Sequence, residues 1–255
     1  MPYQAELYFQ AYQADDLARK PVVFIHGAGG DHLSWPSQLR RLTGYRVYAP
    51  DLPGHGKSKG HGLQRIESYG EAVVSWIHSL ELPKIFLAGH SMGGAITLWI
   101  AVHYPELVQG LVLISTGARL PVNLSLIEDL ANPQGFPAAI ENISSWSFSE
   151  NAEPSLVENV LKKMSKIRPS VLVGDFRACD LVDLTEELGN VQIPTTILVG
   201  DEDKMTPVRF SEELRDGING ARMRICKRTG HMLPLEEPVE TAAEIKRFIE
   251  GVLGS

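Results

Sequence analysis

Short apolar runs alternate with longer amphipathic segments along most of the chain. Helical spacing of apolar residues predicts helices at 66–80, 92–104 and 236–253. Strands that alternate with helices predict an α/β fold, a mostly parallel sheet flanked by helices on both faces. Residues 5–12 are expected to form an antiparallel edge strand. The six runs that predict buried strands are Val22–Ile25, Arg46–Ala49, Ile85–Ala88, Leu111–Ile114, Thr195–Val199 and Met223–Ile225.

One long stretch, residues 117–190, breaks this alternation because it contains no convincing strand. A structureless loop of that length is implausible in a compact domain, so we expect a helical insertion. We therefore predict one domain formed by residues 1–116 and 191–255, and a helical unit at 117–190, called here the cap segment. Its helical pieces, separated by prolines, are predicted at residues 124–130, 137–143, 155–165 and 169–179.

Composition excludes several classes of protein. The 255 residues include 24 Lys and Arg against 31 Asp and Glu, a net charge of −7, which argues against a nucleic-acid partner. No apolar run approaches the ~20 residues of a membrane span. The first residues do not resemble a signal peptide, and Cys179 and Cys226 are too few for a disulfide framework. We expect a cytoplasmic protein, either a monomer or a homodimer.

The strongest chemical signal is Gly89-His90-Ser91-Met92-Gly93, which lies between the strand predicted at 85–88 and the helix predicted at 92–104. A G-x-S-x-G sequence in that setting is typical of a nucleophile elbow, a sharp turn that exposes the serine hydroxyl. Glycines two residues before and after the serine remove Cβ atoms that would collide across the turn. Ser91 is therefore the predicted nucleophile.

A serine hydroxyl needs a base, and that base needs an orienting acid. Of the eight histidines, only His231 combines a loop after the last predicted strand with the chain order serine, acid, histidine. Three carboxylates crowd the turn after the strand at 195–199. We predict Asp203 as the acid that accepts from His231, Asp201 as a residue that bonds its own turn, and Glu202 as a solvated side chain.

Negative charge that develops on the substrate needs backbone N–H donors. One predicted donor is Met92, the residue after the nucleophile. The other is Ala28, in the glycine cluster after the strand at 22–25, with Gly29 as the alternative. We expect neither cofactor nor metal, because His32 interrupts one near-match to a nucleotide-binding motif and Asp51 interrupts another, and no cluster has metal-ligand spacing.

Five segments in order resemble the α/β-hydrolase superfamily. The resemblance implies an eight-stranded sheet, a catalytic triad of Ser91, Asp203 and His231, and a helical cap inserted after the sixth strand. The elbow is similar to the branch that holds small carboxylesterases, monoacylglycerol lipases, lactonases and carbon–carbon bond hydrolases. The five segments are His26–Gly29, Asp51–Ser58, Gly89–Gly94, Gly200–Asp203 and Gly230–His231.

The expected reaction is acyl transfer to water through an acyl-enzyme, on short- to medium-chain carboxylic esters. Five residues are expected to contact this small-molecule substrate: Gly27, Gly29, His90, Trp146 and Met232. Apolar residues of the cap segment, of which several are expected to line an acyl pocket, are Leu124, Leu126, Ile127, Leu130, Phe136, Ile140, Trp146, Phe148, Leu156, Val160 and Met164.

Other reactions use the same triad, since fold does not determine function. The alternatives are a carbon–carbon bond hydrolase, a lactonase, a hydroxynitrile lyase, a cofactor-free perhydrolase and an aminopeptidase, or a non-catalytic ligand receptor. Arg119 and Arg168 are candidates for contact with an anionic substrate. The cap segment holds eleven acidic and six basic residues, a net charge of −5 that is expected to disfavour such substrates.

Overall fold

The computed structural model describes residues 3–254. Within this range, eight strands form one sheet in the order β1-β2-β4-β3-β5-β6-β7-β8. Strands β3 to β8 run parallel, and β2 pairs with β4 in the antiparallel sense. This architecture confirms the predicted mostly parallel sheet. The strands are β1 (Tyr3–Gln4), β2 (Leu7–Tyr12), β3 (Pro21–Ile25), β4 (Arg46–Pro50), β5 (Ile85–His90), β6 (Val108–Ile114), β7 (Thr195–Gly200) and β8 (Arg222–Cys226).

The N-terminal segment differs from the single strand expected at residues 5–12. Ala5 and Glu6 have φ angles of 44° and 66°, which places both in the left-handed region used by tight hairpin turns. They separate β1 from β2, and Gln4 pairs with Leu7 across the turn. The sheet therefore begins with a short hairpin.

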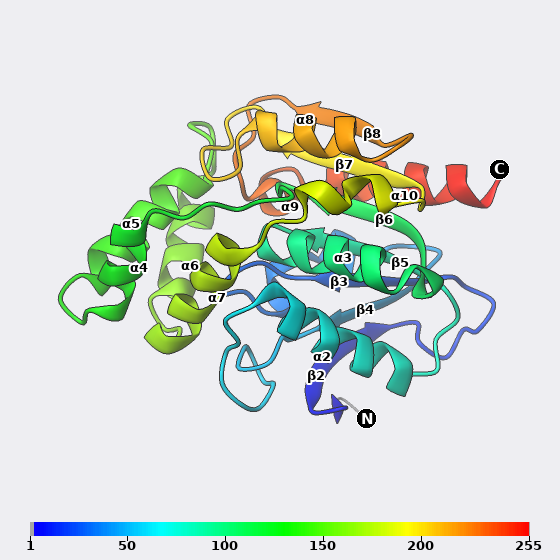
Figure 1. Ribbon diagram of the computed structural model, residues 1–255, viewed down its shortest axis with the longest axis horizontal. Helices are drawn as coiled ribbons and strands as arrows, with labels where there is room; N and C mark the ends of the chain where they lie inside the picture. Colours follow the sequence, from blue (N-terminus) through cyan, green and yellow to red (C-terminus); the bar gives the residue numbers. More distant parts are fainter. Residues whose placement is uncertain (1–2, 255) are drawn as a thin grey trace.

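Helices cover both faces of the sheet (Figure 1). One apolar cluster joins α2 (Ile66–Ser79), α3 (Met92–His103) and α8 (Val208–Gly217) to one face, and a second joins α1 (Ser37–Arg40) and α10 (Pro238–Leu253) to the other. Helix α3 is buried on nearly all sides, as expected for a helix whose apolar residues surround its axis. It directly follows the elbow, so the nucleophile is fixed to the most buried helix of the core.

Four α-helices lie between β6, the sixth strand, and β7, and they sit together to one side of the sheet (Figure 1). They share an apolar cluster of their own that includes Leu130, Ile140 and Leu172. The two ends of the cap segment instead pack into the core cluster, through residues such as Leu120 and Cys179. The helices are α4 (Leu124–Ala131), α5 (Phe136–Ser147), α6 (Pro154–Met164) and α7 (Pro169–Leu181).

The loops that follow the parallel strands all meet the cap segment at one edge of the sheet. In parallel α/β sheets the carboxyl ends of the strands form the usual ligand-binding edge. Here that edge carries the loops after β3, β5, β7 and β8, which hold every residue predicted for the reaction centre except Met92, the first residue of α3. A short helix, α9 (Leu233–Glu236), follows the loop after β8.

Candidate active site

Ser91 stands on a strained turn between β5 and α3. Its φ and ψ angles are 55° and −123°, a combination that non-glycine residues rarely adopt and that is common at functional sites. A Cβ atom on Gly89 would lie 2.2 Å from the Gly93 carbonyl oxygen, and one on Gly93 would lie 2.2 Å from the Ile25 carbonyl oxygen. Only glycine fits at either position, for the steric reason expected from the motif.

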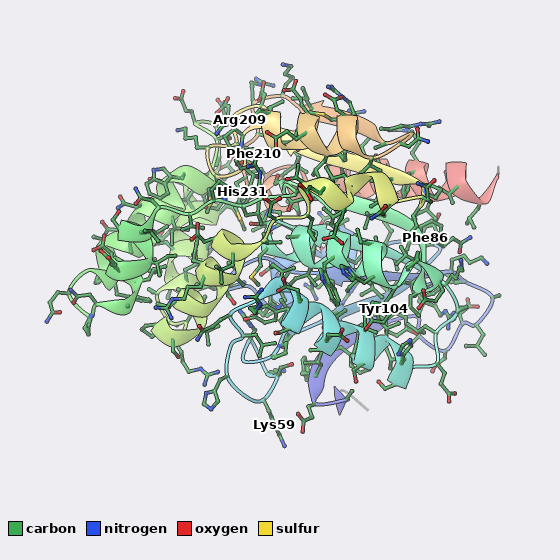
Figure 2. The ribbon with its side chains drawn as sticks, in the orientation of Figure 1. Lys59, Phe86, Tyr104, Arg209, Phe210 and His231 are labelled. Atoms are coloured by element: carbon green, nitrogen blue, oxygen red, sulfur yellow. The ribbon has the colours of Figure 1, made fainter. Side chains whose placement is uncertain are left out.

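His231 and Asp203 lie within hydrogen-bond distance of each other. The His231 Nδ1 atom is 2.9 Å from Oδ2 of Asp203 and 3.1 Å from Oδ1. Both side chains are buried, and Figure 2 shows His231 near the junction between the sheet and the cap helices. Because Nδ1 faces the carboxylate, Nε2 is the ring nitrogen left for proton exchange with a reacting group.

Thr206 was not singled out from the sequence, yet it completes the environment of the acid. Its Oγ1 donates to Asp203 Oδ2 at 2.8 Å and also lies 3.1 Å from His231 Nδ1. The N–H groups of Met205 and Thr206 donate to Asp203 Oδ1 at 3.0 and 2.8 Å. An aspartate followed three residues later by threonine is a local turn pattern that is visible in the sequence.

Asp203 therefore bonds its own turn, which is the role predicted for Asp201. Asp201 instead accepts from the main-chain N–H of Arg228 at 2.6 Å and so joins the loop after β7 to the loop after β8. Glu202, predicted to be solvated, accepts from the N–H of Glu150 at 2.9 Å. The partners of Asp201 and Glu202 are distant in the sequence, so the local sequence could not identify the roles of these two carboxylates.

The charge of the acid is stabilised by its neighbours. Burial alone raises the pKa of Asp203, but the His231 charge and hydrogen bond, with the donors from Thr206, lower this pKa below its ordinary value overall. His90 donates from Nε2 to the main-chain oxygen of His231 at 2.8 Å. Burial, followed by the charge of His231, lowers the pKa of His90 to about 3, so its ring stays neutral at physiological pH.

The turn after β3 carries the predicted oxyanion donors. The N–H of Gly29, the alternative donor, is already bonded to Oδ2 of Asp175 at 2.8 Å. The N–H of Ala28 has no partner among residues 3–254, and Ala28 lines the cavity beside Ser91. Met92 opens α3, where a backbone N–H has no intrahelical acceptor; its side chain is fully buried and does not line the cavity.

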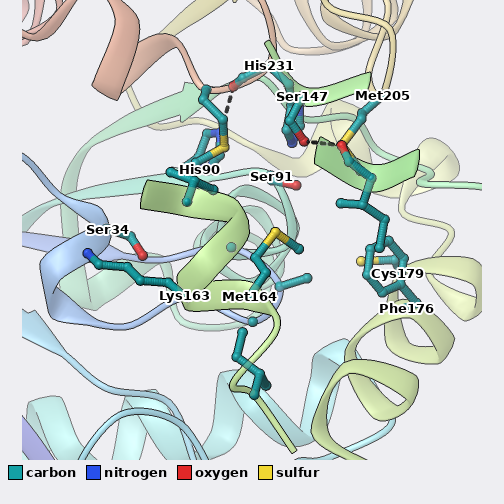
Figure 3. Close-up of a pocket in the computed structure, with 18 of the residues that line it drawn as sticks. Ser34, His90, Ser91, Ser147, Lys163, Met164, Phe176, Cys179, Met205 and His231 are labelled. Atoms are coloured by element: carbon teal, nitrogen blue, oxygen red, sulfur yellow. Dashed lines mark hydrogen bonds between the residues drawn. The ribbon is translucent and has the colours of Figure 1, made fainter. Parts of the chain in front are cut away.

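A cavity of about 640 Å³ lies between the reaction centre and the cap helices (Figure 3). Ser91 and His231 both line it, and so do all five residues predicted to contact the substrate, Gly27, Gly29, His90, Trp146 and Met232. The cap-segment residues that line it as predicted are Leu126, Trp146, Leu156, Val160 and Met164; lining residues that the sequence did not single out include Leu120, Val122, Ile143, Ile167 and Phe176.

Several apolar cap residues have other roles than the one expected. Ile127, Leu130 and Ile140 are buried in the cluster that holds the cap helices together, and Phe136 packs against that cluster. Leu124 is 66% exposed. Helical periodicity therefore identified the apolar faces of the cap segment, but it did not separate residues that pack between helices from residues that face the cavity.

The charged side chains at the cavity are mostly cationic. Among residues 3–254, the cavity is lined by one carboxylate, that of Asp31, and by the cations Lys163, Lys166, Arg168 and Lys204. The acidic residues of the cap segment do not line the cavity, so the net charge of that segment is a poor guide to the substrate. Arg168 Nη2 donates to the carbonyls of Gly54 and Gly60. Arg119 lies 3.9 Å from Glu213 and outside the cavity.

Two further properties concern the class of protein. Within residues 3–254 no group of three or more His, Cys, Asp or Glu side chains could hold a metal ion. In the same range, no helix combines the length and apolar character that crossing a membrane requires.

Comparison with known proteins decides the family. The sequence profile of the Alpha/beta hydrolase family matches residues 22–244. The chain belongs to this family. The match to the alpha/beta hydrolase family includes the parallel strands β3 to β8, the elbow and the cap segment, whereas β1 and β2 lie outside it.

Relatives of this alpha/beta hydrolase include named esterases and a lactonase. A pimeloyl-[acyl-carrier protein] methyl ester esterase of Neisseria meningitidis is 27% identical over 249 residues, covering 92% of this chain and 78% of the relative. A 3-oxoadipate enol-lactonase of Acinetobacter baylyi is 22% identical, covering 91% and 89%. The solved structure of a thermophilic esterase has a TM-score of 0.81 at 28% identity, covering 92% and 90%.

Proposed function

We propose that this protein is a serine hydrolase that cleaves carboxylic esters through an acyl-enzyme on Ser91. The observation that carries this proposal is the joint position of Ser91 and His231 on one cavity, with Asp203 bound to the far side of the imidazole at 2.9 Å. A nucleophile, a base and an orienting acid in that arrangement form the set that acyl transfer requires.

In the first half of the proposed reaction, His231 Nε2 takes the hydroxyl proton as Ser91 Oγ bonds to the carbonyl carbon. The carbonyl electrons move to the oxygen, which the N–H groups of Ala28 and Met92 stabilise. The tetrahedral species then collapses, and the alcohol leaves with the proton from His231. Asp203 keeps the imidazole in the correct tautomer and stabilises its charged form.

In the second half, His231 Nε2 removes a proton from water as the water oxygen attacks the acyl carbon. The second tetrahedral species collapses, Ser91 regains its proton from His231, and the carboxylic acid leaves. Activity falls in acid under this mechanism, because a protonated imidazole cannot act as the base.

The cavity favours an acyl group of short to medium length. Its lining is largely apolar, with Leu126, Ile143, Val160 and Met164 contributed by three different cap helices, and pockets of several hundred Å³ hold small molecules of drug size. The esterase names of the Neisseria relative and of the thermophilic structure support an ester as the bond cleaved.

A lactonase is the second candidate. The similarity to a 3-oxoadipate enol-lactonase over 91% of this chain favours it, and a lactone is an internal ester that the same steps open. The cationic side chains Lys163, Lys166, Arg168 and Lys204 at the cavity are compatible with a substrate that carries a carboxylate.

The test is a substrate panel run on the wild type and on Ser91→Ala. We expect hydrolysis of p-nitrophenyl acetate, butyrate and octanoate, weaker hydrolysis of the laurate, and loss of activity in Ser91→Ala by at least about 10³-fold. Enol-lactones, half-esters of dicarboxylic acids, vinylogous diketones and aminoacyl anilides form the other arms. Preference for a diketone or anilide over every ester, or full ester hydrolysis by Ser91→Ala, contradicts the proposal.

A further inference from the structure

Asp175 on cap helix α7 is a fully buried carboxylate that the reaction does not use. It is 0% exposed and accepts hydrogen bonds from three separate parts of the protein. Its Oδ2 accepts from the N–H of Gly29 and from His55 Nε2, both at 2.8 Å, and its Oδ1 accepts from the Tyr69 hydroxyl at 2.6 Å. Burying a carboxylate costs free energy unless hydrogen bonds compensate for the lost water, and these three donors supply that compensation.

The ring of His55 is doubly protonated in this arrangement. Its Nε2 faces Asp175, and its Nδ1 lies 3.1 Å from the carbonyl oxygen of Pro53, so both nitrogens face acceptors and both must donate. Burial alone lowers the pKa of His55, but the charge and hydrogen bond of Asp175 raise it overall. Asp175 and His55 thus form a buried ion pair at the base of the turn after β3.

That turn, residues 27–30, holds the Ala28 N–H between two fixed peptide groups. On one side, the Gly27 carbonyl oxygen accepts from Gly30 N–H at 3.0 Å and from His26 Nδ1 at 2.9 Å. The Ala28 N–H belongs to the same trans peptide as this carbonyl and points the opposite way. On the other side, Gly29 N–H is held by Asp175, with Gly29 at a φ of 63°.

A neutral His26 ring can bond both the Gly27 carbonyl and the Leu52 N–H. Its Nε2 accepts from Leu52 N–H at 3.0 Å, so the single ring proton lies on Nδ1 and faces the carbonyl. Burial and the nearby charge of His55 lower the pKa of His26 to about 4, and the two rings lie 5.0 Å apart. The charge on His55, fixed by Asp175, therefore also favours the neutral form of His26.

Helix α7 and the segment just before it also pack closely against this turn. A Cβ atom on Gly29 would lie 2.6 Å from Leu172 Cδ2 and 2.8 Å from Ile167 Cδ1. A Cβ atom on Gly174, the neighbour of Asp175, would lie 2.5 Å from the Leu63 carbonyl oxygen. This part of the cap segment is packed tightly enough to hold the turn in one position.

We propose that Asp175 is a positioning residue that, from the cap helix, keeps the turn at residues 27–30 in the shape that aims the Ala28 N–H at the substrate oxyanion. The inference rests on the proposed function, because the oxyanion exists only if Ser91 attacks a carbonyl group. Under this proposal, helix α7 positions an oxyanion donor, and the cap segment therefore contributes to catalysis in addition to covering the cavity.

The test compares Asp175→Asn with the wild type on p-nitrophenyl butyrate and on an alkyl boronic acid. The boronic acid bonds to Ser91 Oγ and places a tetrahedral oxygen where the oxyanion forms. We expect kcat to fall about tenfold to a hundredfold with KM within about twofold. The boronic acid affinity falls by the same factor, whereas the affinity for butyrate, a ground-state ligand, stays unchanged.

Two controls separate positioning from stability. Asp180→Asn is the same change on the same helix, at a carboxylate that accepts from Val122 N–H; asparagine keeps that acceptor, so kcat is expected to stay at the wild-type value. Tyr69→Phe removes another donor to Asp175 and lowers the melting temperature, but it leaves the Gly29 bond intact. Its kcat is expected within about threefold of wild type.

The inference is overturned if Asp175→Asn keeps the wild-type kcat and the wild-type affinity for the boronic acid. It is also overturned if, at equal melting temperature, Asp175→Asn loses no more of its kcat than Tyr69→Phe does. If Asp175→Asn does not fold, Asp175→Glu keeps the charge but moves the carboxylate by one methylene, and the same loss of kcat at unchanged KM is expected. Wild-type protein that neither hydrolyses esters nor binds the boronic acid instead overturns the proposed function, and the role of Asp175 with it.

Discussion

His90, the residue before the nucleophile, donates from Nε2 to the main-chain oxygen of His231, the proposed base, at 2.8 Å. This bond links the elbow after β5 to the loop after β8, and the two rings lie 4.9 Å apart. The sequence predicts His90 as a residue that contacts the substrate. The structure shows a second contact, in which its neutral ring fixes the backbone of the neighbouring histidine.

Replacing His90 by leucine removes this donor, and we expect kcat to fall about fivefold, the effect of one lost hydrogen bond of about 1 kcal/mol. His90→Gln retains an N–H donor at nearly the same reach and is expected to recover most of the rate. Steady-state kinetics on p-nitrophenyl butyrate measure both. If kcat falls equally in the two variants, the His90 ring acts through its packing and not through the hydrogen bond to His231.

Thr206→Val keeps the shape of the side chain but removes the hydroxyl that donates to Asp203. We expect kcat to fall about threefold to tenfold with little change in KM, because the acid then holds the imidazole less firmly. Asp201→Asn is the matched control, since that carboxylate lies in the same turn but bonds Arg228 N–H. A larger loss of kcat in Asp201→Asn than in Thr206→Val would reverse our assignment of the turn.

Gly93→Ala is expected to destroy the elbow, since the new Cβ would lie 2.2 Å from the Ile25 carbonyl oxygen and 2.5 Å from that of His26. Backbone atoms cannot move aside as a flexible side chain can. We expect a loss of several kcal/mol of stability or no soluble protein. Gly251→Ala, in helix α10 where a Cβ meets no atom within 4 Å, is expected to be neutral or stabilising by up to about 1 kcal/mol. Thermal melts that rank the two variants alike would contradict this account.

Much of this fold follows from local pattern. The parallel strands are apolar on both faces, and the elbow is marked by steric requirements within five residues, so both could be predicted. Helix α8 was missed because Ser211 and Leu214 are its only buried residues within the described chain. Its apolar residues are few, Val208, Phe210 and Leu214, and over only ten residues they form too short a pattern to be recognised as a helix from the sequence alone.

Asp175 was missed because its partners, Gly29, His55 and Tyr69, lie far away in the sequence. A signal was present: Asp175 follows Val171 by four residues and Leu172 by three, so it falls on the buried face of helix α7. An acidic residue on such a face requires a donor or a cation. Periodicity thus indicates that a partner exists, but only the tertiary structure identifies it.

Stability is expected to be highest near pH 6.5. The folded state holds His26 and His90 neutral, with pKa values lowered to about 4 and about 3, chiefly by burial. As the pH falls below 6.5, the unfolded chain takes up protons that these rings do not, so stability decreases by up to about 1.4 kcal/mol per pH unit for each ring. The pKa of His55 is raised, so its contribution is complete below 6.5 and is lost as the pH rises.

Thermal melts from about pH 5 to pH 8 measure this dependence. In His90→Gln the acid side of the profile is expected to become shallower, because one of the two rings that resist protonation is gone. In His55→Gln the alkaline side is expected to flatten. An acid limb that stays as steep in His90→Gln as in the wild type would show that other groups control the loss of stability.

The central claim is that Ser91 is a nucleophile activated by His231. Reaction with a fluorophosphonate tests it most directly, since the Ser91 oxygen bonds to phosphorus as fluoride leaves. Intact-protein and peptide mass spectrometry should show one phosphonyl group, located on the peptide that contains Ser91, in folded wild-type protein. The label should be absent from Ser91→Ala and from heat-denatured protein, and at least about 10³-fold slower in His231→Gln. Folded wild-type protein that stays unlabelled, or equal labelling of Ser91→Ala, would contradict the account.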